Sequence, residues 1–361
     1  MSTASVTYDA LLIGQGLAGT LLAHFLQRAG CSVFVIDPGG AGAASQVAAG
    51  IINPITGRRY RKSWRFDELL PAAHATYRAL EEALGCSLYR PQPLLRAIFT
   101  VREENDWLAR SADPACAPYV EDSADLGPYA GCLAPARGYG GVRQAAQVDL
   151  GTLCAAYRAQ LQHAGRLQAA AFRHEQLELT DEGVRYGALR ARQAVFCEGY
   201  RGAANPYFDY LPFHGDKGDV LLVRFPGHAF DRIVKHRVFI VPLPDGRYWI
   251  GATYQRRFET AAPTPAGRAQ LLERLQDAVR IPFEVEDHRA AVRPTVSDRR
   301  PLLGRHPRYP QLALFNGLGT KGASLGPFFA RQLAAHLTGG APLDAEVDIR
   351  RFEERYHRAE K

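Results

Sequence analysis

Three glycines constrain the fold of this chain more than any other feature: Gly14, Gly16 and Gly19, in the segment G-Q-G-L-A-G. They follow an apolar run over residues 8–13 and precede an alanine- and leucine-rich stretch that ends at Arg28. This order predicts a strand, a tight turn and a helix. In such a unit the first glycine permits the turn, the second lets the backbone approach a pyrophosphate, and the third lets helix and strand pack closely. The segment therefore predicts a dinucleotide-binding βαβ unit, with an ordinary glycine-rich turn as the alternative.

An acidic residue completes this unit. A second β-rich run over residues 32–36 ends at Asp37, 18 residues after Gly19. A carboxylate at the end of the second strand accepts hydrogen bonds from ribose hydroxyls and would repel a 2′-phosphate. The unit therefore predicts a site for an ADP moiety, with its pyrophosphate at the helix N-terminus. NAD and FAD both remain open at this point.

Composition excludes several other classes of protein. The chain has 361 residues, enough for two domains, with 47% hydrophobic and 22% charged residues, which excludes disordered, collagen-like and coiled-coil proteins. The six cysteines form no C-x-x-C pair, so we expect them to be reduced and the protein to be cytoplasmic. The apolar stretch over 10–26 lacks a basic leader and is interrupted by Gln15 and His24, which argues against a signal peptide or a membrane span. The dispersed histidines predict no metal site.

The rest of the sequence predicts helices alternating with strands. Helices are expected over 66–84, 150–163, 265–279 and 325–337, and strands over 193–197, 220–225, 238–242, 248–252 and 312–315. The strands between 211 and 254 predict an antiparallel sheet, because a P-D-G turn joins two of them. The region over about 87–147 is rich in proline and glycine, and we expect it to be irregular.

Several longer segments resemble the FAD-dependent D-amino-acid oxidase superfamily, which includes glycine oxidase, sarcosine oxidase and the oxidase domain of a bifunctional tRNA-modifying enzyme. They are A-S-Q-V-A-A-G at 44–50, F-C-E-G-Y at 196–200, V-P-L-P-D-G-R-Y-W-I-G-A-T at 241–253, R-P-T-V-S-D-R-R-P-L-L-G at 293–304 and G-L-G-T-K-G-A-S-L-G-P at 317–327. The last two resemble the paired segments that lie over the flavin ring. The resemblance covers nearly the whole chain and implies FAD as the cofactor.

The resemblance also implies an architecture. We expect an α/β fold with a discontinuous Rossmann-like FAD-binding domain and a substrate domain built on a mixed or antiparallel sheet. The FAD-binding domain would comprise 1–85, 142–210 and 294–361, and the substrate domain 86–141 and 211–293. The active site would lie between them.

Candidate site residues follow from the same resemblance. The expected FAD-binding residues are Gly14, Gly16, Leu17, Ala18, Gly19, Asp37, Ser45, Gln46, Ala49, Gly50, Gly199, Arg293, Gly317, Gly319, Thr320, Lys321 and Gly322. The expected catalytic residues are Arg293, Lys321 and Tyr254. Arg293 matches the position whose guanidinium holds a substrate carboxylate, and Lys321 would lie near the flavin, where it would stabilise the anionic reduced ring or assist oxygen chemistry. Tyr254 would line the substrate pocket. The alternatives are a structural arginine, a solvated loop lysine and a packed tyrosine.

The chain departs from the family pattern at two places. Relatives often carry a tyrosine whose hydroxyl reaches the substrate, where this chain has Phe239. No cysteine lies near 293–321 and no histidine within 43–50, the places where relatives attach flavin covalently. We therefore expect FAD to be bound non-covalently.

A basic segment is also unlike the plain glycine oxidase pattern. N-P-I-T-G-R-R-Y-R-K-S-W-R at 53–65 has five positive residues and no acid, with Trp64 available for stacking; the five are Arg58, Arg59, Arg61, Lys62 and Arg65. It would bind a phosphate, an acidic substrate or RNA, or form a solvated loop. The net charge of +7 is modest, so we favour no nucleic-acid partner.

The function expected from these features is oxidation of the C–N bond of a small amine or amino acid. Hydride would pass to the flavin, with oxygen as a candidate electron acceptor, and the resulting imine would hydrolyse. The alternatives are a tRNA-modification oxidase acting on an aminomethyl-type nucleoside and a NAD-dependent dehydrogenase. The identity of the amine, the choice between oxidase and dehydrogenase, and the oligomeric state stay open.

Overall fold

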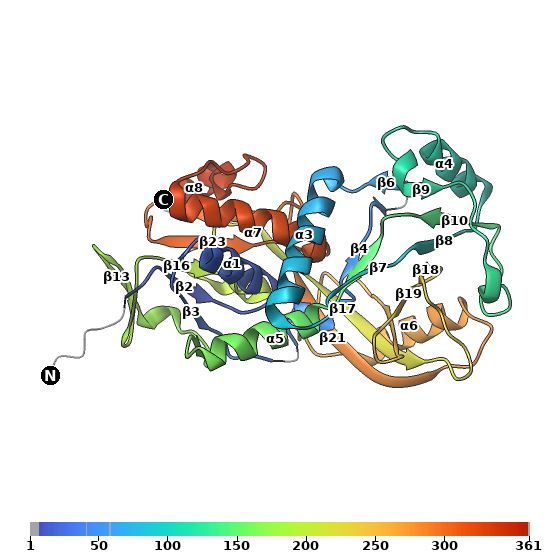
Figure 1. The fold of residues 1–361 in the computed structure, drawn as a ribbon, viewed down its shortest axis with the longest axis horizontal. Coiled ribbons are helices and arrows are strands. Elements are labelled where there is room, and N and C mark those ends of the chain that lie inside the picture. The colour runs from blue at the N-terminus through green and yellow to red at the C-terminus, as the bar shows by residue number, and fades with distance from the viewer. Residues whose placement is uncertain (1–6, 41, 58, 360–361) are drawn as a thin grey trace.

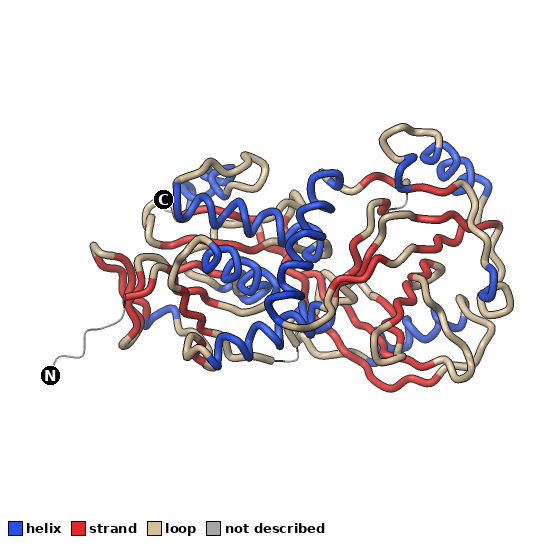
Figure 2. Tube along the Cα trace, in the orientation of Figure 1, coloured by secondary structure: helices blue, strands red, loops and turns tan. Residues whose placement is uncertain are grey.

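The structure, a computed structural model, describes residues 7–40, 42–57 and 59–359. Figure 1 shows two lobes along the longest axis, one containing α1, α7 and α8 and the other α4 and α6. The helices are α1 Leu17–Arg28, α2 Ala44–Val47, α3 Phe66–Leu84, α4 Val101–Ser111, α5 Leu150–His163, α6 Pro265–Gln276, α7 Gly322–Gly339 and α8 Glu353–Ala359. Most helices gather around the first lobe, whereas the second is largely strand (Figure 2).

A six-stranded sheet forms the centre of the first lobe. Its order is β12-β3-β2-β16-β23-β22, with bounds Leu167–Gln168, Val33–Ile36, Ala10–Ile13, Ala194–Phe196, Leu312–Asn316 and Leu302–Arg305. All neighbours are parallel except β22 and β23. The carboxyl ends of β2 and β3 meet at the same edge, where Gly14 and Asp37 follow them. The predicted α/β fold with a Rossmann-like sheet is confirmed.

An eight-stranded mixed sheet forms the second lobe. Its order is β21-β17-β20-β19-β18-β8-β10-β9, with bounds Glu284–Val296, Phe213–Arg224, Tyr248–Gly251, Phe239–Pro242, Ile233–Lys235, Leu94–Ile98, Gly138–Val142 and Val120–Glu121. Only β18 and β8 pair in parallel. The three strands predicted between 211 and 254 are antiparallel neighbours here, as the P-D-G turn indicated.

Three smaller sheets complete the fold. β4 (Ile51–Ile52), β11 (Ala146–Val148) and β7 (Tyr89–Pro91) form one, and β5 (Ile55–Thr56) and β6 (Arg61–Lys62) form a hairpin. The third has the order β1-β15-β14-β13, with bounds Thr7–Tyr8, Leu189–Ala191, Gly183–Tyr186 and Leu177–Thr180. The strands of 86–141 and 211–293 enter the eight-stranded sheet, but there are two differences from the expected boundaries. β7 joins a small sheet, and β10 and β21 continue to Val142 and Val296. The domain boundaries stay a prediction.

The prediction that 87–147 is irregular is wrong. This region contains β7, α4 and β8 to β11. The sequence G-Y-G-G-V of β10 suggests a loop, but a side chain at Gly140 would overlap the indole of Trp107, so close packing requires glycine there. Helix α4 has a detectable signal, a capping box in which Thr100 and Glu103 exchange hydrogen bonds with each other's backbone.

Two predicted helices have different ends. Helix α6 stops at Gln276, and α7 begins at Gly322, one turn earlier than expected. Glycines lower helix propensity, yet a Cβ at Gly326 would come within 2.6 Å of Leu21 in α1. Close packing of α7 on α1 therefore accounts for glycine in this part of the helix.

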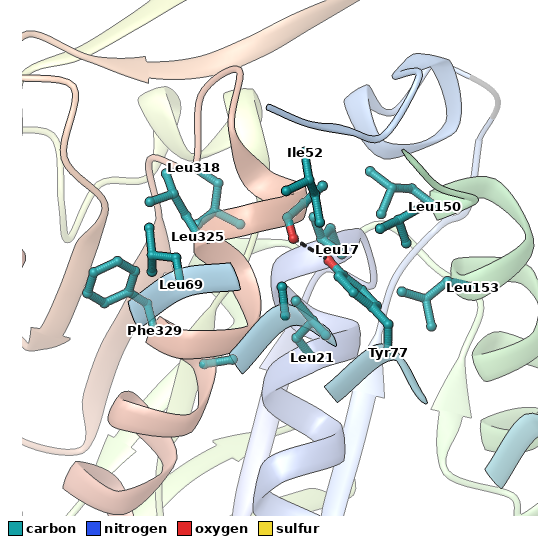
Figure 3. Close-up of a cluster of buried hydrophobic side chains, with 14 of the residues drawn as sticks. Leu17, Leu21, Ile52, Leu69, Tyr77, Leu150, Leu153, Leu318, Leu325 and Phe329 are labelled. Atoms are coloured by element: carbon teal, nitrogen blue, oxygen red, sulfur yellow. Dashed lines mark hydrogen bonds between the residues drawn. The ribbon is translucent and has the colours of Figure 1, made fainter. Parts of the chain in front are cut away.

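A buried apolar cluster joins α1, α3 and α7 (Figure 3). Leu17 and Leu21 of α1 lie between Tyr77 of α3 and the start of α7, which contributes Leu325. The Tyr77 hydroxyl donates a hydrogen bond of 2.8 Å to the carbonyl oxygen of Ala323. This packing fixes the start of α7, and the loop before it, against the glycine turn of α1.

Candidate active site

The glycine turn has the close approaches that its motif predicts. Gly14 has φ +102°, and a Cβ there would overlap the carbonyl oxygen of Cys197 at the end of β16. A Cβ at Gly19 would overlap the carbonyl oxygen of Gly14. Gly16 is the N-cap of α1 and lies near the Ser45 hydroxyl. No side chain caps the helix N-terminus by a hydrogen bond at the point where a pyrophosphate would bind, and this cradle fits FAD.

Asp37 occupies the predicted place at the end of β3, and a second residue holds it there. Its carboxylate accepts hydrogen bonds from the backbone N–H of Gln15 at 2.8 Å and of Gly39 at 2.7 Å. Arg158 of α5 pairs with it, with Nη1 2.7 Å from Oδ1, and also donates to the Asp37 carbonyl. Sequence reasoning missed Arg158. The only signal in the sequence that could have indicated Arg158 is its place as a basic residue on the face of α5 that meets the sheet.

The segment 44–50 lies beside the glycine turn. It forms α2, and the chain then turns at Gly50, which has φ +67° and backbone contacts to Val148 of β11. The carbonyl oxygen of Val47 accepts a hydrogen bond of 2.8 Å from the Trp249 indole of β20. This bond connects the segment to the eight-stranded sheet. Of the other expected residues, Ser45 and Gln46 are half-buried, Ala49 is buried, and Gly199 begins a short 3-10 helix after β16.

The loop 317–322 meets the end of β21. Gly317 has φ +74° and Gly319 has φ +54°. The N–H of Gly319 donates a hydrogen bond of 3.0 Å to the carbonyl oxygen of Pro294. Thr320 is exposed, and Lys321 is the N-cap of α7. The two segments that the sequence pairs by resemblance therefore lie together in space.

Arg293 lies at this junction, half-buried on β21. Its Nη1 is 3.3 Å from the carbonyl oxygen of Asp216 and 3.4 Å from that of Thr253. The guanidinium covers Gly218, where a side chain would overlap it, and lies 4.5 Å from the centroid of the Tyr254 ring. Burial lowers the pKa of Arg293. Among the described residues it forms no ion pair with a carboxylate, so its charge is left for a ligand.

Lys321 is half-buried rather than a solvated loop lysine. Its Nζ lies 3.2 Å from the Ser63 hydroxyl and 3.4 Å from that of Thr56. Burial lowers the pKa of Lys321, and the positive charges of Arg300 and Arg299 lower it further. An anion that forms nearby would be stabilised by these cations.

The basic segment is partly neutralised in the structure. Lys62 pairs with Asp67, and Arg65 pairs with Glu68 and Asp344. Arg59 and Arg61 are exposed on the β5–β6 hairpin, and Arg58 lies outside the described residues.

The expectation that Trp64 is available for stacking is wrong. Its ring packs parallel to that of Phe329, with centroids 5.6 Å apart, and the Arg300 guanidinium lies 4.1 Å from the ring centroid. The ring on which a base would stack is therefore already in contact with two side chains of this chain.

Other expected features can be compared with the described residues only. Within them, no cluster of three or more His, Cys, Asp or Glu residues is placed to hold a metal ion. No helix in the described ranges is long and apolar enough to cross a membrane. The six cysteines are unpaired, and Cys116, Cys154 and Cys197 are buried.

Comparisons with known proteins agree with this geometry. The model of the DAO family, FAD dependent oxidoreductase, matches residues 9–336. The glycine oxidase of Bacillus licheniformis is 25% identical over 355 residues, covering 92% of this chain and 93% of that protein. The bifunctional tRNA 5-methylaminomethyl-2-thiouridine biosynthesis protein MnmC of Idiomarina loihiensis is 24% identical, and the match covers 92% of this chain and 56% of that protein.

A solved structure shows the same fold. Glycine oxidase from Geobacillus kaustophilus superimposes with a TM-score of 0.79 at 22% identity, covering 93% of this chain and 96% of that one. The family match spans both sheets and the glycine turn. The chain therefore belongs to the DAO family of FAD-dependent oxidoreductases.

Proposed function

We propose that this protein oxidises the C–N bond of a small amino acid or an N-substituted glycine, and that Arg293 binds the substrate carboxylate. The observation that carries the proposal is the half-buried Arg293 guanidinium, which has two backbone carbonyls and an aromatic ring as neighbours but forms no ion pair with a carboxylate among the described residues. Guanidinium and carboxylate match through two parallel hydrogen bonds. The glycine oxidase names of the relatives support the same substrate class.

The chain's own residues would orient the substrate and set its protonation state. When bound, FAD supplies a two-electron acceptor for hydride from the carbon next to the amine, and water then hydrolyses the imine product. A protonated amine releases hydride poorly. Arg293 and Lys321 lie on neighbouring segments, and their charges would disfavour the ammonium form of a bound substrate. The two groups therefore favour the neutral amine, which is the reactive form.

The two alternatives have less support. A NAD-dependent dehydrogenase is set aside because the family uses FAD. A tRNA-modification oxidase would need the basic segment to contact phosphates. Lys62 and Arg65 are already paired with carboxylates, and the Trp64 ring is already in contact with Phe329 and Arg300. A small free amine or amino acid is therefore better supported as the substrate than a modified nucleoside in tRNA.

An anaerobic screen tests the proposal. Amino acids and N-alkyl glycines are mixed with the FAD-loaded protein, and loss of the oxidised flavin absorption is followed. Arg293→Met should weaken the apparent affinity by about 2 to 5 kcal/mol, since a buried charge loses its partner. Arg289→Met is the matched control, because Arg289 lies exposed on the same strand, beside Asp287.

Two results would contradict the proposal. One is unchanged affinity in an Arg293→Met protein that retains its FAD. The other is flavin reduction by modified tRNA alone, with no small amine active.

A further inference from the structure

A second pair of cations lies on the same face of the eight-stranded sheet as Arg293. Directly paired residues of neighbouring strands project to the same face. Lys235 of β18 pairs with Arg96 of β8 on one side and with Phe239 of β19 on the other. Phe239 pairs with Gly251, which pairs with Val220 of β17. These pairings place Lys235, Arg96 and Phe239 in one row.

Arg293 belongs to the same face, because its partner Asp216 lies four residues before Val220 on β17. Trp249, two residues before Gly251, also shares this face and donates its hydrogen bond to Val47 of α2. The face is therefore turned toward the FAD-binding segments. Lys235 and Arg96 are half-buried on it.

The nearest described neighbours of this pair include two aromatic rings. The Lys235 Nζ lies 4.7 Å from the centroid of the Phe239 ring, and the Arg96 guanidinium lies 5.3 Å from that of Tyr60. Neither cation forms an ion pair with a carboxylate in the part of the chain that the structure describes. Burial lowers the pKa of Lys235 to about 8, and the charges of Arg96 and Arg274 add to this effect. Two adjacent, partly desolvated cations are unfavourable unless an anion joins them.

A buried polar atom lies beside the pair. Tyr60 is 2% exposed, and its hydroxyl interacts with the Arg96 guanidinium but donates to no acceptor among the described residues. Buried hydroxyls normally donate a hydrogen bond, so one without an acceptor next to two cations indicates a place for an acceptor. Carboxylate and phosphate oxygens accept hydrogen bonds and carry the required charge.

We propose that Lys235 and Arg96 form a second anion-binding subsite, which takes a carboxylate or phosphate group carried by the substrate on an arm. The proposal rests on the proposed role of Arg293 at the other end of that substrate. Lys235 and Arg293 are separated by four strand spacings and by four residues along a strand, which corresponds to roughly 23 Å between their Cα atoms. Even with both side chains directed inward, a free glycine is too short to contact both. The substrate class is thus an elongated amino acid with a distal anionic group.

Phe239 fits this assignment. This chain presents the apolar ring of Phe239 against Lys235. Going away from Arg293 across the sheet, a substrate arm would first meet the apolar ring of Phe239 and then the two cations, Lys235 and Arg96. An arm with an apolar stem and a charged end matches that order.

The first test is binding of inorganic phosphate, measured by calorimetry on the FAD-loaded protein. Lys235→Met and Arg96→Met should each weaken phosphate binding about tenfold, and Lys235→Arg should retain it. Arg237→Met is the control, because Arg237 is exposed in the turn beside Lys235 and contacts Phe99. Unchanged affinity in both methionine variants, or an equal loss in Arg237→Met, would overturn the subsite.

The second test asks whether the anion belongs to the substrate. N-(5-carboxypentyl)glycine and the uncharged N-hexylglycine are compared for anaerobic reduction of the flavin. Lys235→Met should raise the apparent dissociation constant about tenfold for the first compound only. Equal effects on both compounds would overturn the substrate arm. If neither compound reduces the flavin, the proposed function fails, and the phosphate titration still decides whether the subsite exists.

Discussion

The Arg293 guanidinium lies 4.5 Å from the centroid of the Tyr254 ring. Arg293 is on β21, whereas Tyr254 follows β20, and β17 separates the two strands in the sheet. Tyr254 is 66% exposed. An exposed ring that covers a half-buried cation shields it from water on one side, so the cation binds an anion more strongly from the other side.

Tyr254→Ala should therefore weaken substrate binding at Arg293. A cation–π contact contributes about 0.5 to 2 kcal/mol, which corresponds to a rise in KM of roughly 2- to 30-fold. Tyr254→Phe keeps the ring and should remain close to wild type. The measurement is KM and kcat for both variants. If KM rises as much in Tyr254→Phe as in Tyr254→Ala, the hydroxyl, rather than the ring, acts on the substrate.

The segment that carries Tyr254 is anchored at both ends by Asp219. The buried carboxylate accepts a hydrogen bond of 2.8 Å from the N–H of Thr264, and the Asp219 carbonyl accepts one of 3.1 Å from the N–H of Thr253. The ring of His288 lies 3.0 Å from the same carboxylate.

Asp219→Asn should lower the free energy of unfolding by about 1 to 3 kcal/mol, because buried donors lose a charged acceptor. It should also raise KM, since the Thr253 hydroxyl, next to Tyr254, loses its charged acceptor. The control is Asp287→Asn, whose partner Arg289 is exposed and whose ion pair contributes little. Urea unfolding and steady-state kinetics measure the two effects. A stability loss with unchanged KM would separate the anchor from the site.

FAD should be lost when the glycine turn is filled. Gly19→Ala places a Cβ against the carbonyl oxygen of Gly14, which must shift the backbone that approaches the pyrophosphate. Gly339→Ala is the matched control, because Gly339 also lies in a helix but has open space at its Cβ. Flavin per protein after gel filtration gives the comparison. Normal flavin content in Gly19→Ala would contradict the assignment.

The cofactor should be released by acid precipitation. No cysteine lies near 293–321 and no histidine within 43–50, so we expect no covalent bond to the flavin. The supernatant should contain FAD, identified by chromatography. Colour that stays in the pellet would show attachment elsewhere in the chain.

Stability should fall as the pH drops below neutral. Burial lowers the pKa of His24 to about 4, and burial together with neighbouring cations lowers that of His236 to about 4. Both folded values lie below 6.5, so the unfolded chain binds more protons between pH 6.5 and 4. The contribution of the two neutral histidines to the free energy of unfolding is complete above pH 6.5 and is lost as the pH falls toward 4. At pH 5 the free energy of unfolding is lower by about 1 to 2 kcal/mol per histidine.

His24→Leu should reduce this acid sensitivity, since the buried Nε2 of His24 has no hydrogen-bond partner among the described residues. His163→Gln, at an exposed position on α5, is the control. Urea unfolding at pH 7 and pH 5 tests the difference. Equal pH dependence in His24→Leu and the control would rule out His24 as a source.

Features that depend on neighbours in sequence could be predicted. The glycine turn, Asp37 and the strands around the P-D-G turn depend on backbone geometry within a few residues, and the structure contains them. The pairing of 293–304 with 317–327 came from resemblance, and the two segments touch. By contrast, the strands of 87–147 were missed. In β10, for example, Gly140 is required by the distant indole of Trp107 rather than by a local turn.

By itself, the sequence determined the principal strands and helices outside 87–147, the place of the nucleotide turn and the family resemblance, because each depends on contiguous residues. Only the tertiary structure decided which side chains meet. Arg158 joins Asp37, Phe329 and Arg300 cover Trp64, and Lys235 pairs with Arg96 across two strands. These contacts follow from strand register and helix packing, which bring together residues far apart in the chain and set the burial and charge that each one meets.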